Sequence, residues 1–237
     1  MTNFRRATPT DTKGIATVVY DVWAQDILTD VCAAQIQDDT CALWVAADKD
    51  DIAGFVSAFL TVCKDGDRRW EVDLVAVRRA SQGQHLGQRL VAKACQDARM
   101  HNVSVARAIV RVDNIASQRT FENAGFTTDW AIHKLLLWTP KSSDNPIDVA
   151  NSVALLPMDT LTYRGLWIEG LTWEGLTTAE QRQAIRAARS MVAKDGRLNA
   201  GALIPIDEEH LLATDLRDEA RVHGEYYWFI KPKEALL

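Results

Sequence analysis

Apolar positions along residues 1–138 switch between two periods, which predicts alternating helices and strands. Ile15, Val18 and Val22 fall on one face of a helix, whereas residues 71–77 alternate as a strand does. Strands are expected at 3–6, 41–47, 52–62, 71–77, 103–112 and 130–138. Helices are expected behind Thr8, at 29–37, at 84–100 and in a segment ending near Asn123. With turns at 48–51 and 64–67, this order predicts an α+β fold. Its sheet is mixed and largely antiparallel, flanked by helices, and its second to fourth strands form an antiparallel meander.

Residues 139–152 contain two prolines among serine, aspartate and asparagine, which is typical of a linker. We therefore expect one unit at 1–138 and a smaller one at 153–237. In the smaller unit, strands are expected at 163–171, 198–206 and 226–230, and helices at 177–194 and 208–222.

This β-α-β-α-β order repeats the second half of the first unit. Residues 204–207 align best with 110–113, at an offset of 207 − 113 = 94. The sequence thus predicts a degenerate half-repeat packed against the first unit. Because the repeat lacks a glycine turn ahead of its helix, no second phosphate site is expected.

Composition and charge narrow the class of protein. The chain has 237 residues, 47% of them hydrophobic and 25% charged, and a net charge of −5, which gives no electrostatic case for a nucleic-acid partner. No run approaches eighteen apolar residues and the start of the chain lacks an apolar signal core, so we expect a cytoplasmic protein without a membrane partner. The four cysteines are widely spaced, which favours buried reduced thiols over disulfides or a zinc site.

Residues 70–90 contain the clearest candidate for a binding site. A strand ending at Val77 passes through a turn and enters a helix behind Gly83 and Gly87. Such a turn aims free backbone N–H groups and the positive end of the helix dipole at one point, which suits a phosphate or pyrophosphate. Two glycines in a strand-to-helix turn are common, so on this motif alone a plain connection remains the alternative.

Two motifs together resemble the GNAT superfamily of acyl-CoA-dependent N-acetyltransferases. The first is Val75-Ala76-Val77 followed by Gln82-Gly83-Gln84-His85-Leu86-Gly87, which is similar to the family signature Gln/Arg-x-x-Gly-x-Gly/Ala. The second, residues 114–126, is similar to the family stretch Asn-x-x-Ala-x-x-x-Tyr-x-x-x-Gly-Phe. Their order, spacing and strand–helix settings make the combination far more specific than either motif.

The resemblance implies an acyltransferase that moves an acetyl group from acetyl-CoA, its cosubstrate, to a primary amine of a small molecule or peptide by direct attack. It implies that the strand at 75–77 splays from its neighbour and pairs with the pantetheine arm, while N–H groups at the helix start hold the pyrophosphate. The implied cofactor-binding residues are Val75, Ala76, Val77, Gln82, Gly83, Gln84, His85, Leu86, Gly87, Gln88, Asn114 and Phe121.

Two residues depart from the family pattern. His85 stands at the middle glycine of the signature, which is tolerable if its backbone angles stay helical; the imidazole then either contacts the pyrophosphate or faces solvent. Phe121 stands where the family often has a tyrosine that protonates the departing thiolate. We expect Phe121 to be a core aromatic, and the enzyme to be slower rather than inactive, because a thiol of pKa about 8.5 is a fair leaving group.

Glu71 is the first candidate for the catalytic base, because some family members place a glutamate at that position, and Asp73 is the second. Alternation puts Glu71, Asp73, Val75 and Val77 on one face, where two carboxylates raise each other's pKa. The alternative is a solvated acidic stretch without a role. His133 is a reserve acid or base.

A competing function is a non-catalytic module that binds CoA or a partner protein. The role of the C-terminal unit stays open between covering the pocket, pairing subunits in a homodimer and stabilising the sheet. The arginines at 68, 69, 78 and 79 form either an adenosine-phosphate contact or a solvated rim.

Overall fold

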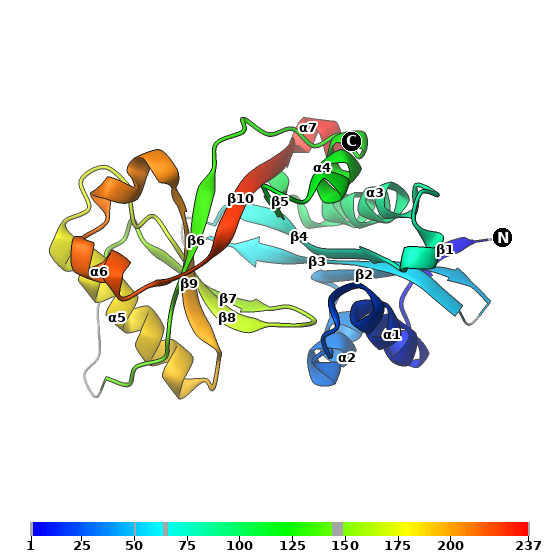
Figure 1. The fold of residues 1–237 in the computed structure, drawn as a ribbon, viewed down its shortest axis with the longest axis horizontal. Helices are drawn as coiled ribbons and strands as arrows, with labels where there is room; N and C mark the ends of the chain where they lie inside the picture. The colour runs from blue at the N-terminus through cyan, green and yellow to red at the C-terminus, as the bar shows by residue number, and fades with distance from the viewer. Residues whose placement is uncertain (1, 50, 64–65, 144–148, 237) are drawn as a thin grey trace.

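The computed structural model describes residues 2–49, 51–63, 66–143 and 149–236. The predicted turns at 48–51 and 64–67 and the linker at 139–152 lie partly outside these residues. Within them one ten-stranded sheet runs in the order β1-β2-β3-β4-β5-β10-β6-β9-β8-β7 (Figure 1). The strands are β1 (Asn3–Arg6), β2 (Cys41–Asp48), β3 (Asp51–Val62), β4 (Arg68–Val77), β5 (Val105–Arg111), β6 (His133–Trp138), β7 (Ala154–Asp159), β8 (Arg164–Glu169), β9 (Asn199–Pro205) and β10 (Arg221–Pro232). The helices are α1 (Thr12–Trp23), α2 (Thr29–Gln37), α3 (Leu86–Ala98), α4 (Ile115–Asn123), α5 (Thr178–Lys194), α6 (Thr214–Asp218) and α7 (Lys233–Leu236). The predicted α+β class is confirmed.

Strands β2 to β4 form the predicted antiparallel meander, and β1 pairs antiparallel with β2 at its edge. Helices α1 and α2 pack on one face of it, where Ile15 and Phe55 are fully buried. Helices α3 and α4 pack on the other face, over Trp70, Val72 and the alanines of β5. The meander is therefore sandwiched between two helical layers, as its apolar runs predict.

Strand β4 contains a β-bulge at Asp73. Ala58 lies opposite Val72 and Ser57 lies opposite Leu74, so Asp73 is the extra residue between them. An extra residue inverts the inside–outside alternation of everything beyond it.

The bulge overturns the prediction that Glu71, Asp73, Val75 and Val77 share one face. Val72 before the bulge and Val75 and Val77 after it all pack against the core under α3. Glu71, on the other side of the strand from Val72, therefore points away from the face that carries Val75 and Val77. Strict alternation fails here because the pairing partner, not the local sequence, sets the register.

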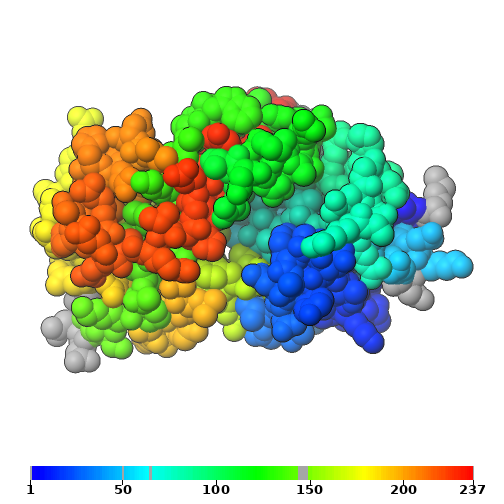
Figure 2. Space-filling model, in the orientation of Figure 1, coloured from blue at the N-terminus to red at the C-terminus, as the bar shows by residue number. Residues whose placement is uncertain are grey.

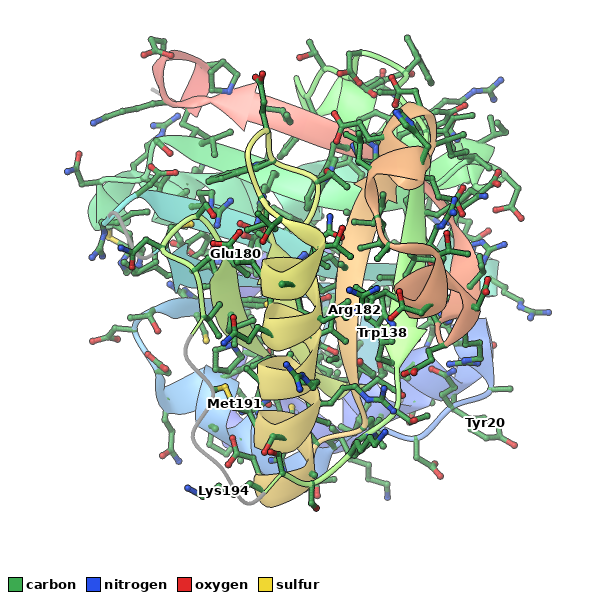
Figure 3. The ribbon with its side chains drawn as sticks, turned by 90° about the vertical axis from the view of Figure 1, so that its left-hand side faces the viewer. Tyr20, Trp138, Glu180, Arg182, Met191 and Lys194 are labelled. Carbon is green, nitrogen blue, oxygen red and sulfur yellow. The ribbon has the colours of Figure 1, made fainter. Side chains whose placement is uncertain are left out.

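The C-terminal residues repeat the fold of the first unit at the predicted offset. Strand β9 lies 94 positions after β5 at both of its ends, 199 − 105 and 205 − 111. In each unit one long helix joins two parallel strands: α3 joins β4 to β5, and α5 joins β8 to β9. Figure 3 shows α5 running along the end of the molecule, from Glu180 in its first turn to Lys194 in its last.

Two details of the C-terminal prediction are wrong. A strand precedes β8, namely β7, which the sequence pattern did not reveal. The helix expected at 208–222 is instead a 3-10 turn (Ile206–Leu211), the short α6 and the start of β10. Arg221 and Val222 pair with Leu137 and Leu136 of β6, so sheet pairing outweighs the helical spacing of the local sequence.

The two units exchange their last strands. β10 pairs with β5 of the first unit, and β6 pairs with β9 of the second; β10 and β6 also pair with each other. Phe229 of β10 is fully buried in the core of the first unit, against Phe121. One sheet thus runs through both units, and their division at 139–152 stays a prediction from composition.

The turn after β7 also reaches the first unit. Leu161 is fully buried among residues of α1 and β3, and its carbonyl accepts a hydrogen bond from the Leu28 amide (2.7 Å). The Gln35 side chain donates to the Asp159 carbonyl (3.0 Å). The blue N-terminal helices and the yellow and orange segments of the C-terminal unit lie on opposite sides of the surface in Figure 2, with yellow-green atoms between them.

Candidate active site

Strands β4 and β5 diverge to form an opening in the sheet. They pair in parallel only where residues 69–71 meet 105–107, and the pairing ends at Glu71 and Arg107. Beyond that point, no strand among the described residues pairs with Val75 to Val77 on the β5 side of β4. The strands splay as the family resemblance implies, and the bulge at Asp73 sits beside the vertex.

A cavity of about 410 Å³ lies in this opening, within the range of small-molecule sites. Every predicted cofactor-binding residue except Gln84 lines it. The set comprises Val75, Ala76, Val77, Gln82, Gly83, His85, Leu86, Gly87, Gln88, Asn114 and Phe121.

Sequence reasoning missed part of the lining. Val22 and Trp23 enter from the end of α1, and Arg119 and Thr120 enter from α4. Arg119 and Thr120 follow Ala116, which also lines the cavity, at helical spacing. The sequence could therefore have predicted that this face of α4 lines the site. No local signal marks Trp23, because only the packing of α1 on the sheet brings it here.

The turn after β4 holds its shape through backbone conformation. The Gln82 side chain donates to the Val77 carbonyl (3.1 Å), and Gly83 adopts a left-handed φ of 78°. The Arg89 amide donates to the carbonyl of His85, the N-cap of α3 (3.2 Å). The amides of residues 86–88 precede this first intrahelical bond, so they point out of the helix end toward the cavity.

The expectation that His85 keeps helical backbone angles is wrong. Its φ of 57° and ψ of 19° are left-handed. A non-glycine residue in this region costs roughly 1–2 kcal/mol, which explains why the family signature has glycine here. The imidazole is exposed at the cavity mouth.

Gly87 allows close packing of three elements. A Cβ atom at this position would lie 3.3 Å from Cγ2 of Thr120 on α4 and 3.8 Å from Cγ1 of Val75 on β4. The neighbouring Gln88 side chain donates to the Asn123 carbonyl (2.8 Å). The start of α3 is therefore fixed against the far wall of the cavity.

Helix α4 forms that far wall. Asn114 is its N-cap, and its side-chain oxygen accepts a hydrogen bond from the Ser117 amide (3.1 Å). Phe121 is buried and packs edge-on against Phe126, with ring centroids 5.1 Å apart. Phe121 thus has the core position expected for it, with one part of the ring at the cavity.

Asp73 has unusual surroundings at the bulge. Its Oδ2 atom is buried, and none of the described residues donates a hydrogen bond to it. Burial, followed by the nearby charge of Glu71, raises the pKa of Asp73 to about 7. A carboxylate with such a pKa can accept a proton at neutral pH.

Glu71 is held in a buried ion pair. Both of its carboxylate oxygens accept from Nε of Arg107 (2.9 Å each), and Oε1 also accepts from the Thr61 hydroxyl (2.6 Å). Arg107 Nη2 binds Glu169 of β8 at 2.6 Å, and Arg69 binds the same carboxylate at 2.7 Å. The two predicted catalytic acids therefore differ, because Glu71 is neutralised by a cation and Asp73 is not.

The other candidate residues from the sequence, His133 and four arginines, are not among the residues that line the cavity. The ring Nδ1 of His133 lies 3.0 Å from the Ala131 carbonyl. The four arginines do not form one cluster: Arg68 and Arg69 begin β4, whereas Arg78 and Arg79 follow its other end.

Cys32, Cys41 and Cys95 are buried thiols, whereas Cys63 is half-buried and its sulfur accepts a hydrogen bond from Arg69. Within the described ranges, no set of three or more His, Cys, Asp or Glu side chains could hold a metal ion. Of the helices that the structure describes, none has the length and hydrophobicity needed to cross a membrane.

Known proteins share both the motifs and the fold. Residues 11–126 match the model of the acetyltransferase (GNAT) family. No curated protein matches the chain. Among solved structures, a GCN5-related glucosamine N-acetyltransferase region of a fungal multi-domain GH3 β-N-acetylglucosaminidase is 13% identical, with a TM-score of 0.62 over 98% of this chain and 38% of that one. A candidate acetyltransferase from Pyrococcus horikoshii is 12% identical, with a TM-score of 0.60 over 98% of this chain and 89% of that one.

At such low identity these two structures show the fold alone, but they show it over both units. The family match covers the meander, the turn after β4, and α4, which are the parts that build the cavity. Residues 11–126 therefore form a GNAT acetyltransferase domain.

Proposed function

We propose that this protein transfers an acetyl group from acetyl-CoA to a primary amine by direct attack of the amine on the thioester. One observation carries the proposal: the β4 edge at Val75 to Val77 and the start of α3 line one cavity, and Asp73, an acid of raised pKa, precedes that edge by two residues on β4.

Coenzyme A fits the chemistry of this cavity in two parts. The amides of its pantetheine arm can pair with the free edge of Val75 to Val77 as an added strand would. Its pyrophosphate can accept hydrogen bonds from the amides at the start of α3, where the helix dipole favours negative charge. Arg119, on the facing wall, adds a cation.

Asp73 is the base in this proposal. The amine must lose a proton to attack, and the Asp73 carboxylate takes it, directly or through a water molecule. The amine nitrogen bonds to the carbonyl carbon, the C–S bond breaks and the electron pair leaves with the sulfur. Phe121 cannot protonate this thiolate, so CoA leaves as the anion or is protonated by water. Holding both substrates in one cavity supplies a large part of the acceleration.

Trp23 of α1 lines the cavity and gives it one aromatic wall. Trp228 of β10 lies against the Arg107 guanidinium, 4.5 Å from the ring centroid. Small-molecule and peptide amines both remain acceptors to be tested.

The test measures release of free thiol from acetyl-CoA across a panel of amines. Asp73→Asn should reduce the rate by at least a hundredfold, as is typical for loss of a general base, while calorimetry shows unchanged affinity for CoA. Asp30→Asn, which alters an exposed carboxylate on α2, is the matched control and should keep the wild-type rate.

A second candidate is a module that binds CoA without catalysis, and the observation in its favour is Phe121 at the position of the family's tyrosine. Tight CoA binding with no thiol release for any amine would favour this alternative. Absence of CoA binding would overturn both.

A further inference from the structure

We propose that Glu169, contributed by strand β8 of the C-terminal unit, is a positioning residue that sets the electrostatic surroundings of Asp73 through Arg107 and Glu71. The proposal rests on the proposed function, because it gives the second unit a role in that same site.

The geometry is a continuous chain of charged contacts between the units. Arg107 Nη2 lies between two carboxylates, 2.8 Å from Oε1 of Glu71 and 2.6 Å from Oε1 of Glu169. The other oxygen of Glu169 binds Arg69 at 2.7 Å. The indole of Trp228 covers the guanidinium of Arg107. Glu169 therefore fixes the arginine that in turn fixes Glu71.

All four charged side chains are largely withdrawn from water. Their exposed fractions are 8% for Glu71, 13% for Arg107, 20% for Glu169 and 12% for Arg69. Burial alone would raise the pKa of Glu169, but Arg107 and Arg69 outweigh it and hold that pKa below its ordinary value. Two cations and two anions leave the cluster neutral, so removal of any one of them leaves a net charge that solvent screens poorly.

The elements that pack around β4 carry several other charged side chains. Glu71 is the charged group that acts on it directly. Strand β3, its neighbour in the sheet, carries only Asp51, which lies at the far end and pairs with Arg78. Helix α1 carries Lys13 and Asp21, and the Asp21 carboxylate accepts a hydrogen bond from the Arg79 amide. Helix α3 carries Arg89, Lys93 and Asp97, which pairs with Arg6, and on β5 Arg111 pairs with Asp113. We therefore expect the pKa of Asp73 to depend on the charge of Glu71, and on Arg107 and Glu169 through their contacts with Glu71.

Substitutions that change the net charge of the cluster in opposite directions should shift the pKa of Asp73 in opposite directions. Glu169→Gln gives the cluster a net positive charge, which favours ionised Asp73 and lowers its pKa. Arg107→Gln leaves a net negative charge, which favours protonated Asp73 and raises its pKa. Glu71→Gln should lower the pKa most, because it removes the charge that acts directly.

The experiment follows two readouts in the full-length chain. The first is the pH dependence of kcat/KM for acetyl transfer, whose acidic limb reports the base. The second is a carbon-13 NMR titration of the Asp73 carboxyl, which needs no activity. We expect a downward shift on the order of half a pH unit for Glu169→Gln, about one unit downward for Glu71→Gln, and an upward shift for Arg107→Gln.

Asp30→Asn is the matched control, because the Asp30–Arg164 pair also joins the two units but is exposed. It should leave both the pH profile and the titration unchanged. Arg107→Lys keeps the positive charge, so it should leave the pKa of Asp73 close to its wild-type value, unlike Arg107→Gln.

Equal titration of Asp73 in wild type and Glu169→Gln would overturn the proposal, as would a fall in rate with an unmoved pH profile, which is the mark of a merely structural contact. If Arg107→Gln fails to fold, the NMR shift in the isosteric Glu169→Gln decides alone. An inactive wild type would refute the acetyl-transfer function, while the NMR titration would still decide the coupling.

Discussion

Asp73→Asn should make the protein more stable at neutral and alkaline pH while abolishing acetyl transfer. The Asp73 carboxyl is buried beside Glu71, and no described residue donates a hydrogen bond to its Oδ2 atom, so the folded state resists its ionisation and its pKa rises to about 7 from the ordinary 3.8. The unfolded chain ionises it freely above that ordinary value. A raised folded-state pKa means that stability is fully present below pH 4 and is lost progressively as the pH rises to about 7.

The size of the stability penalty follows from the difference between the pKa of Asp73 in the unfolded and the folded state. Each pKa unit corresponds to about 1.4 kcal/mol, so a shift of about three units places an upper limit of roughly 4 kcal/mol on the penalty above pH 7. At pH 5 less than half of this penalty is present. Asparagine cannot ionise, so the advantage of the variant over wild type should grow by about 2–3 kcal/mol between pH 5 and pH 8.

Urea denaturation of wild type and Asp73→Asn at pH 5 and pH 8 measures this difference. The denaturation midpoint of the variant should exceed that of wild type, and the gap should widen at pH 8. Asp51→Asn, an exposed carboxylate paired with Arg78, is the control and should show no comparable widening. A gap that is the same at both pH values would mean that Asp73 ionises normally and would refute the reasoning.

Three further predictions concern backbone conformation, acid sensitivity and the contact between units. His85→Gly should raise the free energy of unfolding by about 1 kcal/mol in urea melts, because glycine adopts the left-handed conformation without strain; a loss of stability would show that the imidazole makes a stabilising contact. Hydrogen bonds from Arg5 and, to a lesser extent, from Thr8 lower the pKa of Asp11 to about 2, so about 1–2 kcal/mol of stability should be lost as the pH falls from 4 to 2, and Arg5→Ala should weaken this dependence in acid melts. Leu161→Ala should cost about 2–5 kcal/mol because Leu161 is fully buried between the units, whereas the exposed Leu198→Ala should cost little; equal effects in thermal melts would contradict this packing role.

The local chemistry of the site was accessible from the sequence because each part of it lies within one short segment. The strand ending at Val77, the turn around Gly83 and the helix start at Leu86 follow one another along the chain. Asn114 and Phe121 likewise lie in one helix, whose start and end are marked by its cap and by Gly125. Backbone groups within such segments take their positions from local conformation, so their lining of one cavity was predictable once the family motifs were seen.

The contributions of Trp23, Trp228 and Glu169 were not accessible in this way. Each comes from an element whose place depends on distant pairing: α1 packs across the meander, β10 inserts beside β5, and the β7–β8 connection reaches α2. Nothing in the sequence near Glu169 indicates that Arg107, 62 positions earlier, is its partner.

The sequence by itself determined the α+β class, the order of the meander, the glycine-containing turn after Val77 and the offset of 94 that relates the two units, because these depend on local period and spacing. The tertiary structure alone decided the bulge at Asp73, the exchange of β6 and β10, and the ion pairs that neutralise Glu71. Register and strand order are set by which edges meet across the folded sheet, and a one-residue bulge reverses faces without changing the local pattern.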